Sequence, residues 1–503
     1  MNRDAELTDL KQRLQEVDDL RRAGAVLNWD QATYMPPGGA AARGRQLALL
    51  DRLAHERMTD PAIGGLLDSL APWADTQGAD SDVAALVRVT RRDYERAARV
   101  PPAFIERFSQ HTASTYHAWQ RARPANDFGA VRQGLETTVE LSRELASFYP
   151  GSAHPHDALI DRAEDGMTVG AVRSLFAELR AGLVPLIDRI RGKPEVDSSC
   201  LNGGFPESAQ QAFGESIIRA FGYDYDRGRQ DKTAHPFCTK LGCGDVRITA
   251  RFRPDALSDG LFSMLHEAGH ALYEQGIADS LDATPLFRGT TAGVHESQSR
   301  LWENLVGRSL PFWKHWFAPL KEAFPDALNG AGVETFYRAI NKVTPSLIRT
   351  RADEVTYNLH VMLRFDLELA LLEGTLAVAD LPDAWRARIS SDLGIAPPDD
   401  RDGVLQDVHW YDGPVGGAFQ SYTLGNIMSA QFLGAARRDL PDLDEQIGAA
   451  EFGPLRGWLT ERIYRHGRKF TAPETVERAT GQPLSIAPYL GYLEGKYGAL
   501  YAL

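Results

Sequence analysis

Apolar residues recur every three or four positions over most of the chain, and this helical period limits the fold more than any other feature. Leu7, Leu10 and Leu14 show it near the start, and residues 175–183 show it later. Clusters of Pro and Gly interrupt the period at 35–39, 149–157, 198–206 and 394–403. The sequence therefore predicts a mainly helical body of enzyme size.

One segment follows a different period. Within GDVRITARF, the apolar residues Val246, Ile248 and Ala250 alternate with polar ones, which is typical of a strand. Gly242 and Gly244 lie just before the alternation, so we expect a small β-hairpin here. The chain shows no internal repeat and no low-complexity tract, which argues against a solenoid.

Charge and hydropathy exclude two classes of partner. The 503 residues include 55 Lys and Arg against 68 Asp and Glu, a net charge of −13 with no basic patch, so we expect no nucleic acid partner. The charged start, MNRDAELTDLKQRLQ, is unlike a secretory signal, and Glu368 and Glu373 interrupt the most apolar stretch, 367–379. We expect a cytoplasmic protein without a membrane segment.

Three cysteines, Cys200, Cys238 and Cys243, are too few for a disulfide framework and suit a reducing compartment. A zinc site at Cys238 and Cys243, with His235 nearby, is an alternative to buried free thiols. Their C-x4-C spacing favours the free thiols.

Residues 258–276 predict a helix with one apolar stripe. Ser258 or Asp259 is available as its N-cap and Gly276 as its C-terminal stop. The stripe consists of Leu261, Leu265, Ala268 and Leu272.

The same helix carries the motif H-E-x-x-H at His266, Glu267 and His270. Four residues at 3.6 per turn return a side chain to within about 40° of its starting direction, so both imidazoles can share one metal ion. Glu267 projects about 100° away from His266, where it can take a proton from water as the general base. The alternative is a pair of core or surface histidines without a metal.

A third ligand is expected from the next helix. After the Gly- and Thr-rich loop 288–293, helical period resumes in VHESQSRLWENLVGR, with Glu296 in its first turn. A helix, a loop and an antiparallel helix would bring Glu296 beside His270 and complete a site with one open position. The alternative is a carboxylate that the helix macrodipole favours.

HEAGH at 266–270 followed by HESQSRLWEN at 295–304 resembles the carboxypeptidase Taq family of metallocarboxypeptidases. Further segments match in the expected order over nearly the whole chain. They are LNWDQATYMPPGG at 27–39, HPF at 235–237, Asp245-x-Arg247-x-Thr249, IRTRAD at 348–353 and GVLQDVHW at 403–410.

The resemblance implies a mainly α fold of neurolysin-like metallopeptidase architecture, with a long central groove and a small β-hairpin or sheet near the active site. We expect residues 1–503 to form a single metallopeptidase unit. Within it, residues 1–230 would form one helical groove wall, and residues 231–503 the catalytic part. The resemblance also implies a homodimer.

The function implied is a metal-dependent carboxypeptidase that releases single residues from peptides with a free C-terminus. It would use one divalent metal per subunit, zinc or else cobalt. Glu267 would act as base and then as acid toward the leaving nitrogen. A helical oligoendopeptidase that cuts internal bonds is one alternative, and a non-catalytic peptide-binding scaffold is another.

The resemblance also implies substrate-binding residues. His409 and Tyr422 are candidates to stabilise the oxyanion, although a packed aromatic cluster is equally compatible with them. A guanidinium suits a terminal carboxylate, and Arg349 is the candidate for this contact, with Arg247 closing the groove end and Arg351 a weaker third.

Three further residues, His295, Gln298 and Asp353, are candidates to orient the metal ligands. As polar residues near helix starts, they are equally compatible with ordinary structural positions.

Overall fold

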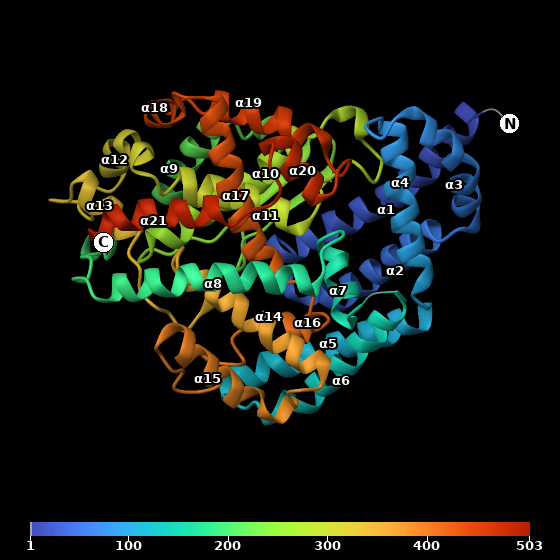
Figure 1. Ribbon diagram of the computed structural model, residues 1–503, viewed down its shortest axis with the longest axis horizontal. Coiled ribbons are helices and arrows are strands. Elements are labelled where there is room, and N and C mark those ends of the chain that lie inside the picture. The colour runs from blue at the N-terminus through green and yellow to red at the C-terminus, as the bar shows by residue number, and fades with distance from the viewer. Residues whose placement is uncertain (1–2, 152) are drawn as a thin grey trace. The chain divides into compact units, whose positions relative to one another are not determined.

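The computed structural model describes residues 3–151 and 153–503 and confirms a mainly helical fold with a small sheet (Figure 1). The chain divides into two compact units. Unit 1 consists of Met1–Ala98, Val196–Ile340 and Met428–Leu484. Unit 2 consists of Arg99–Glu195, Asn341–Ile427 and Ser485–Leu503. Each unit therefore combines segments that are far apart in the sequence.

Unit 1 contains most of the N-terminal helices, the sheet and the helix with the H-E-x-x-H motif. Its helices are α1 (Arg3–Thr33), α2 (Ala40–Met58), α3 (Pro61–Ala74), α4 (Asp82–Arg99, whose last residue belongs to unit 2), α9 (Glu207–Phe221), α10 (Leu257–Gly276), α11 (Ala292–Arg300), α12 (Leu310–Ala323), α13 (Val333–Ile340), α18 (Leu443–Gly448), α19 (Gly453–Arg462) and α20 (Ala472–Thr480). A π-helix, Leu301–Val306, directly follows α11.

Unit 2 is helical in its described residues. Its helices are α5 (Pro102–Ala125), α6 (Gly129–Ser147), α7 (Pro155–Ala163), α8 (Val169–Arg191), α14 (Tyr357–Glu373), α15 (Leu381–Leu393), α16 (His409–Asp412) and α21 (Ala487–Tyr501). Helix α17 (Gln420–Asp439) begins in unit 2 and continues in unit 1.

The helix breaks fall where the sequence places Pro and Gly clusters. Helix α1 ends at Thr33 and α2 begins at Ala40, on either side of MPPGG. Likewise, α15 ends at Leu393 before the cluster at 394–403. These breaks follow from proline's missing amide hydrogen and from glycine's conformational freedom.

The predicted hairpin is confirmed and belongs to a three-stranded sheet of order β1-β3-β2. Strands β2 (Cys238–Gly242) and β3 (Asp245–Ala250) pair antiparallel, and Gly244, at a φ of +81°, makes the turn that joins them. Strand β1 (Gln230–Lys232), which the sequence analysis missed, pairs parallel with β3. Its three residues are too few to show an alternating pattern.

Helix α10 is buried on nearly every side rather than along one stripe. The predicted stripe residues are at most 3% exposed, and Phe262, Met264 and Tyr273 on other faces are at most 2% exposed. The predicted N-cap is wrong, because the helix begins at Leu257 and Ala256 is its N-cap, without a side-chain hydrogen bond. The end at Gly276 is confirmed. A helix buried all round is held by packing more than by its cap.

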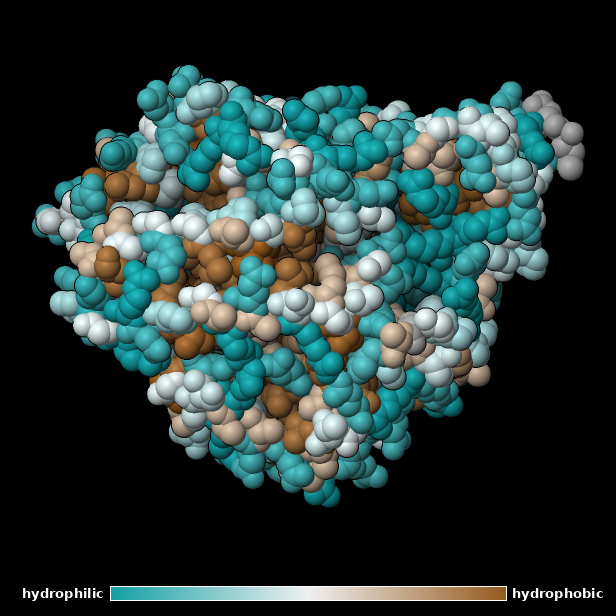
Figure 2. All heavy atoms as spheres, in the orientation of Figure 1, coloured by the Kyte–Doolittle hydropathy of each residue, from teal (hydrophilic) through white to brown (hydrophobic). Residues whose placement is uncertain are grey.

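In unit 2, helix α21 lies along α8, and Figure 2 shows hydrophobic residues where the two meet. A Cβ at Gly182 of α8 would lie 2.6 Å from Leu490 Cδ1 of α21. Glycine at this position therefore lets the C-terminal helix pack closely on α8.

The three cysteines are free, as expected, but the expectation that they are buried is wrong. Cys243 is exposed, because it lies in the hairpin turn, and Cys200 and Cys238 are half-buried. Among the helices of the described residues, none combines the length and apolar composition needed to cross a membrane.

Helix α14 carries a buried acid. Glu368 is 1% exposed, and its Oε1 accepts a hydrogen bond of 2.8 Å from Trp410 Nε1. Burial raises the pKa of this carboxyl from 4.5 to about 7. The folded state is therefore stabilised most when Glu368 is protonated.

We expect the substitution Glu368→Gln to stabilise the protein at pH 8 and to have little effect below pH 4.5. The folded-state pKa is raised, so the wild type loses stability as the pH rises from 4.5 to about 7, whereas glutamine does not titrate. The gain at pH 8 should be up to about 3 kcal/mol of unfolding free energy. Urea unfolding of both proteins across this range measures it, and a difference that does not change with pH would contradict the assignment.

Candidate metal centre and active site

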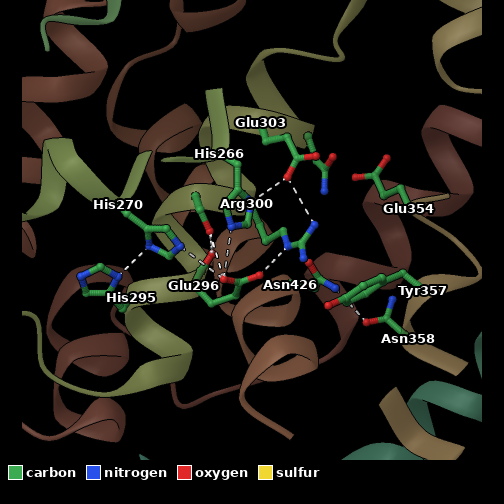
Figure 3. A network of polar contacts seen from close by, with 12 residues as sticks. His266, His270, His295, Glu296, Arg300, Glu303, Glu354, Tyr357, Asn358 and Asn426 are labelled. Atoms are coloured by element: carbon green, nitrogen blue, oxygen red, sulfur yellow. Dashed lines mark hydrogen bonds and ion pairs between the residues drawn. The ribbon is translucent and has the colours of Figure 1, made fainter. Parts of the chain in front are cut away.

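Three side chains of unit 1 converge on one point, and they come from α10 and α11. Within the described residues, His266, His270 and Glu296 form a group in which one ligand atom from each lies within 4.8 Å of the others. Glu296 Oε2 lies 3.6 Å from His266 Nε2 and 3.5 Å from His270 Nε2 (Figure 3). Ligands about 2.1 Å from a tetrahedral ion lie about 3.4 Å apart. The separations of Glu296 Oε2 from the two imidazole nitrogens therefore fit an ion of the size of zinc.

The two helices reach this geometry through a close backbone contact. A Cβ at Gly269, inside the motif, would lie 2.6 Å from Gln298 O and 2.6 Å from Ser299 Cα of α11. Backbone atoms cannot move aside cheaply in a packed core, so only glycine fits here. This approach brings the Glu296 side chain to the imidazoles.

The prediction that Glu296 lies in the first turn of its helix is wrong. Helix α11 begins at Ala292, because Thr291 Oγ1 accepts a hydrogen bond from the amide of Val294 and caps the helix early. Glu296 therefore lies in the second turn, where the helix macrodipole is weak. Its charge is balanced by side chains instead.

Arg300 holds one oxygen of Glu296, and the other faces the imidazoles and accepts a hydrogen bond of 3.3 Å from Ser299 Oγ. Arg300 Nε donates to Glu296 Oε1 at 2.7 Å, and Nη1 donates to Glu303 Oε2 at 3.3 Å. Burial would raise the pKa of Glu296, but Arg300 and the imidazoles lower it well below its usual range. Glu296 is therefore an anion, as a metal ligand must be.

The Nδ1 atom of His266 contacts Glu303 Oε2 at 2.9 Å. Glu303 lies in the π-helix, and Arg308 Nη2 lies 3.6 Å from its other oxygen. Burial would raise the pKa of Glu303, but Arg300 and His266 lower it to about 2. Burial would lower the pKa of His266, but Glu296 and Glu303 raise it.

The Nδ1 atom of His270 contacts another imidazole. It lies 2.6 Å from His295 Nδ1, and His295 Nε2 lies 2.8 Å from Glu274 Oε1. Lys240 Nζ of β2 pairs with Glu274 Oε2 at 3.1 Å. Burial would raise the pKa of Glu274, but His295 and Lys240 lower it to about 2. Burial and His295 lower the pKa of His270 to about 4, so His270 is neutral at pH 7.

Glu267 is 7% exposed, and burial raises its pKa from 4.5 to about 7. A carboxyl with this pKa can accept and return a proton near neutral pH. A purely structural metal site needs no such group.

Arg349, in unit 2, is held by a half-buried carboxylate. Its Nη2 donates to Asp407 Oδ1 at 3.0 Å, and its Nη1 donates to Tyr357 Oη at 3.0 Å. Arg364 also pairs with Asp407, through the other oxygen. Burial would raise the pKa of Asp407, but Arg364 and Arg349 lower it well below its usual range. Two buried guanidinium groups thus share one carboxylate.

The structure brings His409 and Tyr422 of unit 2 together. His409 Nε2 lies 3.3 Å from Tyr422 Oη, and the guanidinium carbon of Arg349 lies 5.1 Å from the centre of the Tyr422 ring. His409 Nδ1 also lies 3.7 Å from Asp407 Oδ1. The candidate oxyanion and carboxylate groups of the sequence analysis therefore form one cluster.

The other arginine candidates lie elsewhere. Arg247, on β3 of unit 1, makes two hydrogen bonds of 2.8 Å to Asp245 and stacks 4.3 Å from the centre of the Trp29 ring. Trp29 belongs to the matched segment 27–39. Arg351 is exposed in unit 2.

The remaining candidates make local contacts. The two carboxylate oxygens of Asp353 accept amide hydrogens from Thr344, Val355 and Thr356. The Nε2 atom of Gln298 donates to Ser297 Oγ at 2.8 Å.

Sequence reasoning missed four residues of the metal centre, Lys240, Glu274, Arg300 and Glu303. Helical spacing could have found three of them, because Glu274 follows His270 by four residues, as Arg300 follows Glu296, and Glu303 follows Glu296 by seven. For Lys240 no sequence signal exists, because it reaches Glu274 from the sheet.

This arrangement of two imidazoles, one carboxylate and a buried acid on a helical body defines a metallopeptidase-type centre. The model of the carboxypeptidase Taq (M32) metallopeptidases matches residues 9–497. Thermostable carboxypeptidase 1 of Thermus thermophilus is 43% identical over 511 residues and 100% of both chains. Carboxypeptidase 1 of Bacillus subtilis is 35% identical over 97% of both. The M32 carboxypeptidase structure from Deinococcus radiodurans R1 superposes with a TM-score of 0.97 at 50% identity, covering 99% of this chain and 100% of its own.

The chain belongs to the carboxypeptidase Taq (M32) family of metallopeptidases. It is a metallocarboxypeptidase, a hydrolase that acts on peptides and uses a divalent metal. The family and the names of its relatives favour this function over the oligoendopeptidase and scaffold alternatives.

We expect Gly269→Ala to weaken metal binding at least tenfold, because the new Cβ forces α10 and α11 apart. The free energy of unfolding should fall by about 1–3 kcal/mol, as in other overpacked cores. Gly24→Ala in α1 is the control: no heavy atom lies within 4 Å of its added Cβ, so the metal affinity should not change. Chelator competition and urea unfolding measure the two effects. Unchanged metal affinity in Gly269→Ala would contradict the role of the contact.

Proposed function

We propose that His266, His270 and Glu296 hold the divalent metal and that zinc is the physiological ion, with cobalt able to replace it. The observation that carries this proposal is the convergence of two imidazole nitrogens and one carboxylate oxygen within 4.8 Å. This mixed nitrogen and oxygen set suits zinc and cobalt and leaves one position open. When bound, the cation polarises the scissile carbonyl and lowers the pKa of water toward about 7.

We propose that Glu267 is the general base and then the general acid. It takes the proton from the attacking water and delivers it to the leaving amide nitrogen, which departs as a neutral amine. Two properties support this role: the carboxyl is 7% exposed, and its pKa is raised by burial to about 7.

We propose that Arg349 binds the terminal carboxylate of the peptide, while His409 and Tyr422 donate to the oxyanion. A planar guanidinium makes two parallel bonds to a carboxylate, and Asp407 fixes the plane of Arg349. His409 and Tyr422, whose polar atoms lie 3.3 Å apart, can act on one oxygen. Arg247 is proposed to close the far end of the binding site, with its guanidinium oriented by Asp245.

His295 and Gln298 are proposed to orient the metal ligands, together with Asp353. The contact of His295 with His270 at 2.6 Å supports its role most strongly. Gln298 acts through α11, whose backbone contacts Gly269. Asp353, whose carboxylate accepts the amide hydrogen of Thr356 just before α14, is proposed to act at a distance.

We propose that the protein acts as a cytoplasmic homodimer and that residues 1–503 work as a single metallopeptidase unit, with 1–230 forming the groove wall and 231–503 the catalytic part. Sedimentation velocity measures the oligomeric state, and the mass of one subunit at micromolar concentration would contradict the dimer. Cell fractionation measures the location.

We expect Glu267→Gln to retain the metal while peptidase turnover falls by about 10²–10⁴, because glutamine cannot accept the proton. Metal content by elemental analysis and turnover of a short peptide measure the two properties. The wild type treated with a chelator should lose activity and regain it with Zn²⁺ or Co²⁺. Turnover near the wild-type value in Glu267→Gln would exclude this residue as the base.

We expect Arg349→Lys to lower kcat/KM for a peptide with a free C-terminus by about 10–100-fold, because the charge stays while the paired hydrogen bonds are lost. The preference for the free acid over the same peptide amidated should fall in parallel. Arg351→Lys is the matched comparison, because this neighbouring arginine is exposed. An unchanged preference in Arg349→Lys would assign carboxylate recognition to another residue. Mass spectrometry of the products measures the loss of single residues.

A further inference from the structure

Each imidazole that faces Glu296 has a second partner at its other ring nitrogen (Figure 3). His266 Nδ1 meets the carboxylate of Glu303 directly, at 2.9 Å. His270 Nδ1 meets His295 Nδ1 at 2.6 Å, and His295 in turn meets Glu274 at 2.8 Å. His266 is thus supported by one residue, and His270 by a chain of two residues.

The partners of Glu274 fix the direction of the first hydrogen bond in the longer chain. Its Oε1 accepts the amide hydrogen of Gly289 at 3.0 Å, and its Oε2 accepts from Lys240 at 3.1 Å. Glu274 is therefore an acceptor throughout, and His295 Nε2 must donate to it.

A His295 ring whose single proton lies on Nε2 has its lone pair on Nδ1, so in the contact at 2.6 Å His270 Nδ1 donates. The lone pair of His270 lies on Nε2, the atom 3.5 Å from Glu296 Oε2. By the same reasoning Glu303 accepts from His266 Nδ1, so the singly protonated His266 ring has its lone pair on Nε2. Both imidazoles thus have the tautomer that a metal ligand needs.

We propose that Glu274 and Glu303 are positioning residues of the metal centre that act through two independent relays. Glu303 orients His266 directly, and Glu274 orients His270 through His295. This inference rests on the proposed metal-binding role of the two histidines.

The two relays are anchored on different elements. Glu274 is tied to β2 by Lys240, and the side chains of this ion pair are 11% and 8% exposed, so water screens it little. Glu303 is tied to Arg300, which also binds Glu296. The relays share no residue, so the loss of one leaves the other intact.

The test measures Zn²⁺ affinity by competition with a chromogenic chelator in Glu303→Gln, Glu274→Gln and His295→Phe. We expect each substitution to weaken binding by about 10–100-fold, the usual effect of removing a group that orients a ligand. The double variant Glu274→Gln/His295→Phe should bind Zn²⁺ no more weakly than whichever of the two single variants has the lower affinity, because both substitutions break the same relay. In Glu303→Gln/Glu274→Gln the two losses should multiply.

The control is Asp93→Asn in α4, a half-buried acid of unit 1, which pairs with Arg468 at 2.7 Å and touches no imidazole in the contacts described. Its Zn²⁺ affinity should stay within twofold of the wild type. Melting of the metal-free proteins reports any general loss of stability. The visible spectrum of the Co²⁺ form should change in Glu274→Gln and not in Asp93→Asn, because it reports ligand geometry.

Two outcomes overturn the inference: wild-type affinity in both Glu274→Gln and His295→Phe, or losses from these two substitutions that multiply. Should Glu274→Gln fail to fold, His295→Phe carries the test, because it leaves Glu274 paired with Lys240. The variant His266→Ala distinguishes a failure of this inference from a failure of the proposed function. Wild-type Zn²⁺ affinity in His266→Ala would remove the metal site itself.

Discussion

The close approach of α10 and α11 at Gly269 is the constraint on which the metal centre depends. A helix brings two imidazoles to one side by its own geometry, but it cannot supply a third ligand on that side at the right distance. The backbone contact with Gln298 and Ser299 sets that distance, and Glu296 Oε2 reaches both imidazoles as a result. The absence of a single methyl group therefore allows the site to form.

Burial of so many charges is possible because each acid has a defined partner. Glu296 and Glu303 share Arg300, and Glu274 pairs with Lys240. Their pKa values are lowered, so they remain anions beside the imidazoles. Glu267 differs, because burial outweighs its neighbours and raises its pKa. The same buried environment thus yields a charged candidate ligand, Glu296, and, one residue from His266, an acid that can exchange its proton.

The balance of charge in unit 2 is different. Arg349 and Arg364 share the single carboxylate of Asp407, so positive charge is in excess there. An excess of buried charge is costly unless another group compensates it. The carboxylate at the end of a peptide is a group of the right charge and shape, and His409 and Tyr422 lie in the same cluster. Asp407 thus orients Arg349, the candidate carboxylate-binding residue, and also contacts Arg364 and His409.

The sequence by itself determined the helices, the hairpin and the H-E-x-x-H motif, because these depend on spacing along one element, which covalent geometry fixes. It also placed Glu296 on the following helix, although the start of that helix came out earlier than expected. Only the tertiary structure decided that β1 joins the sheet, that Gly269 sets the distance between helices, and that Lys240 of β2 pairs with Glu274 of α10. The reason is physical. These contacts join residues of different helices and strands, and the packing of those elements, not local spacing, sets which residues meet.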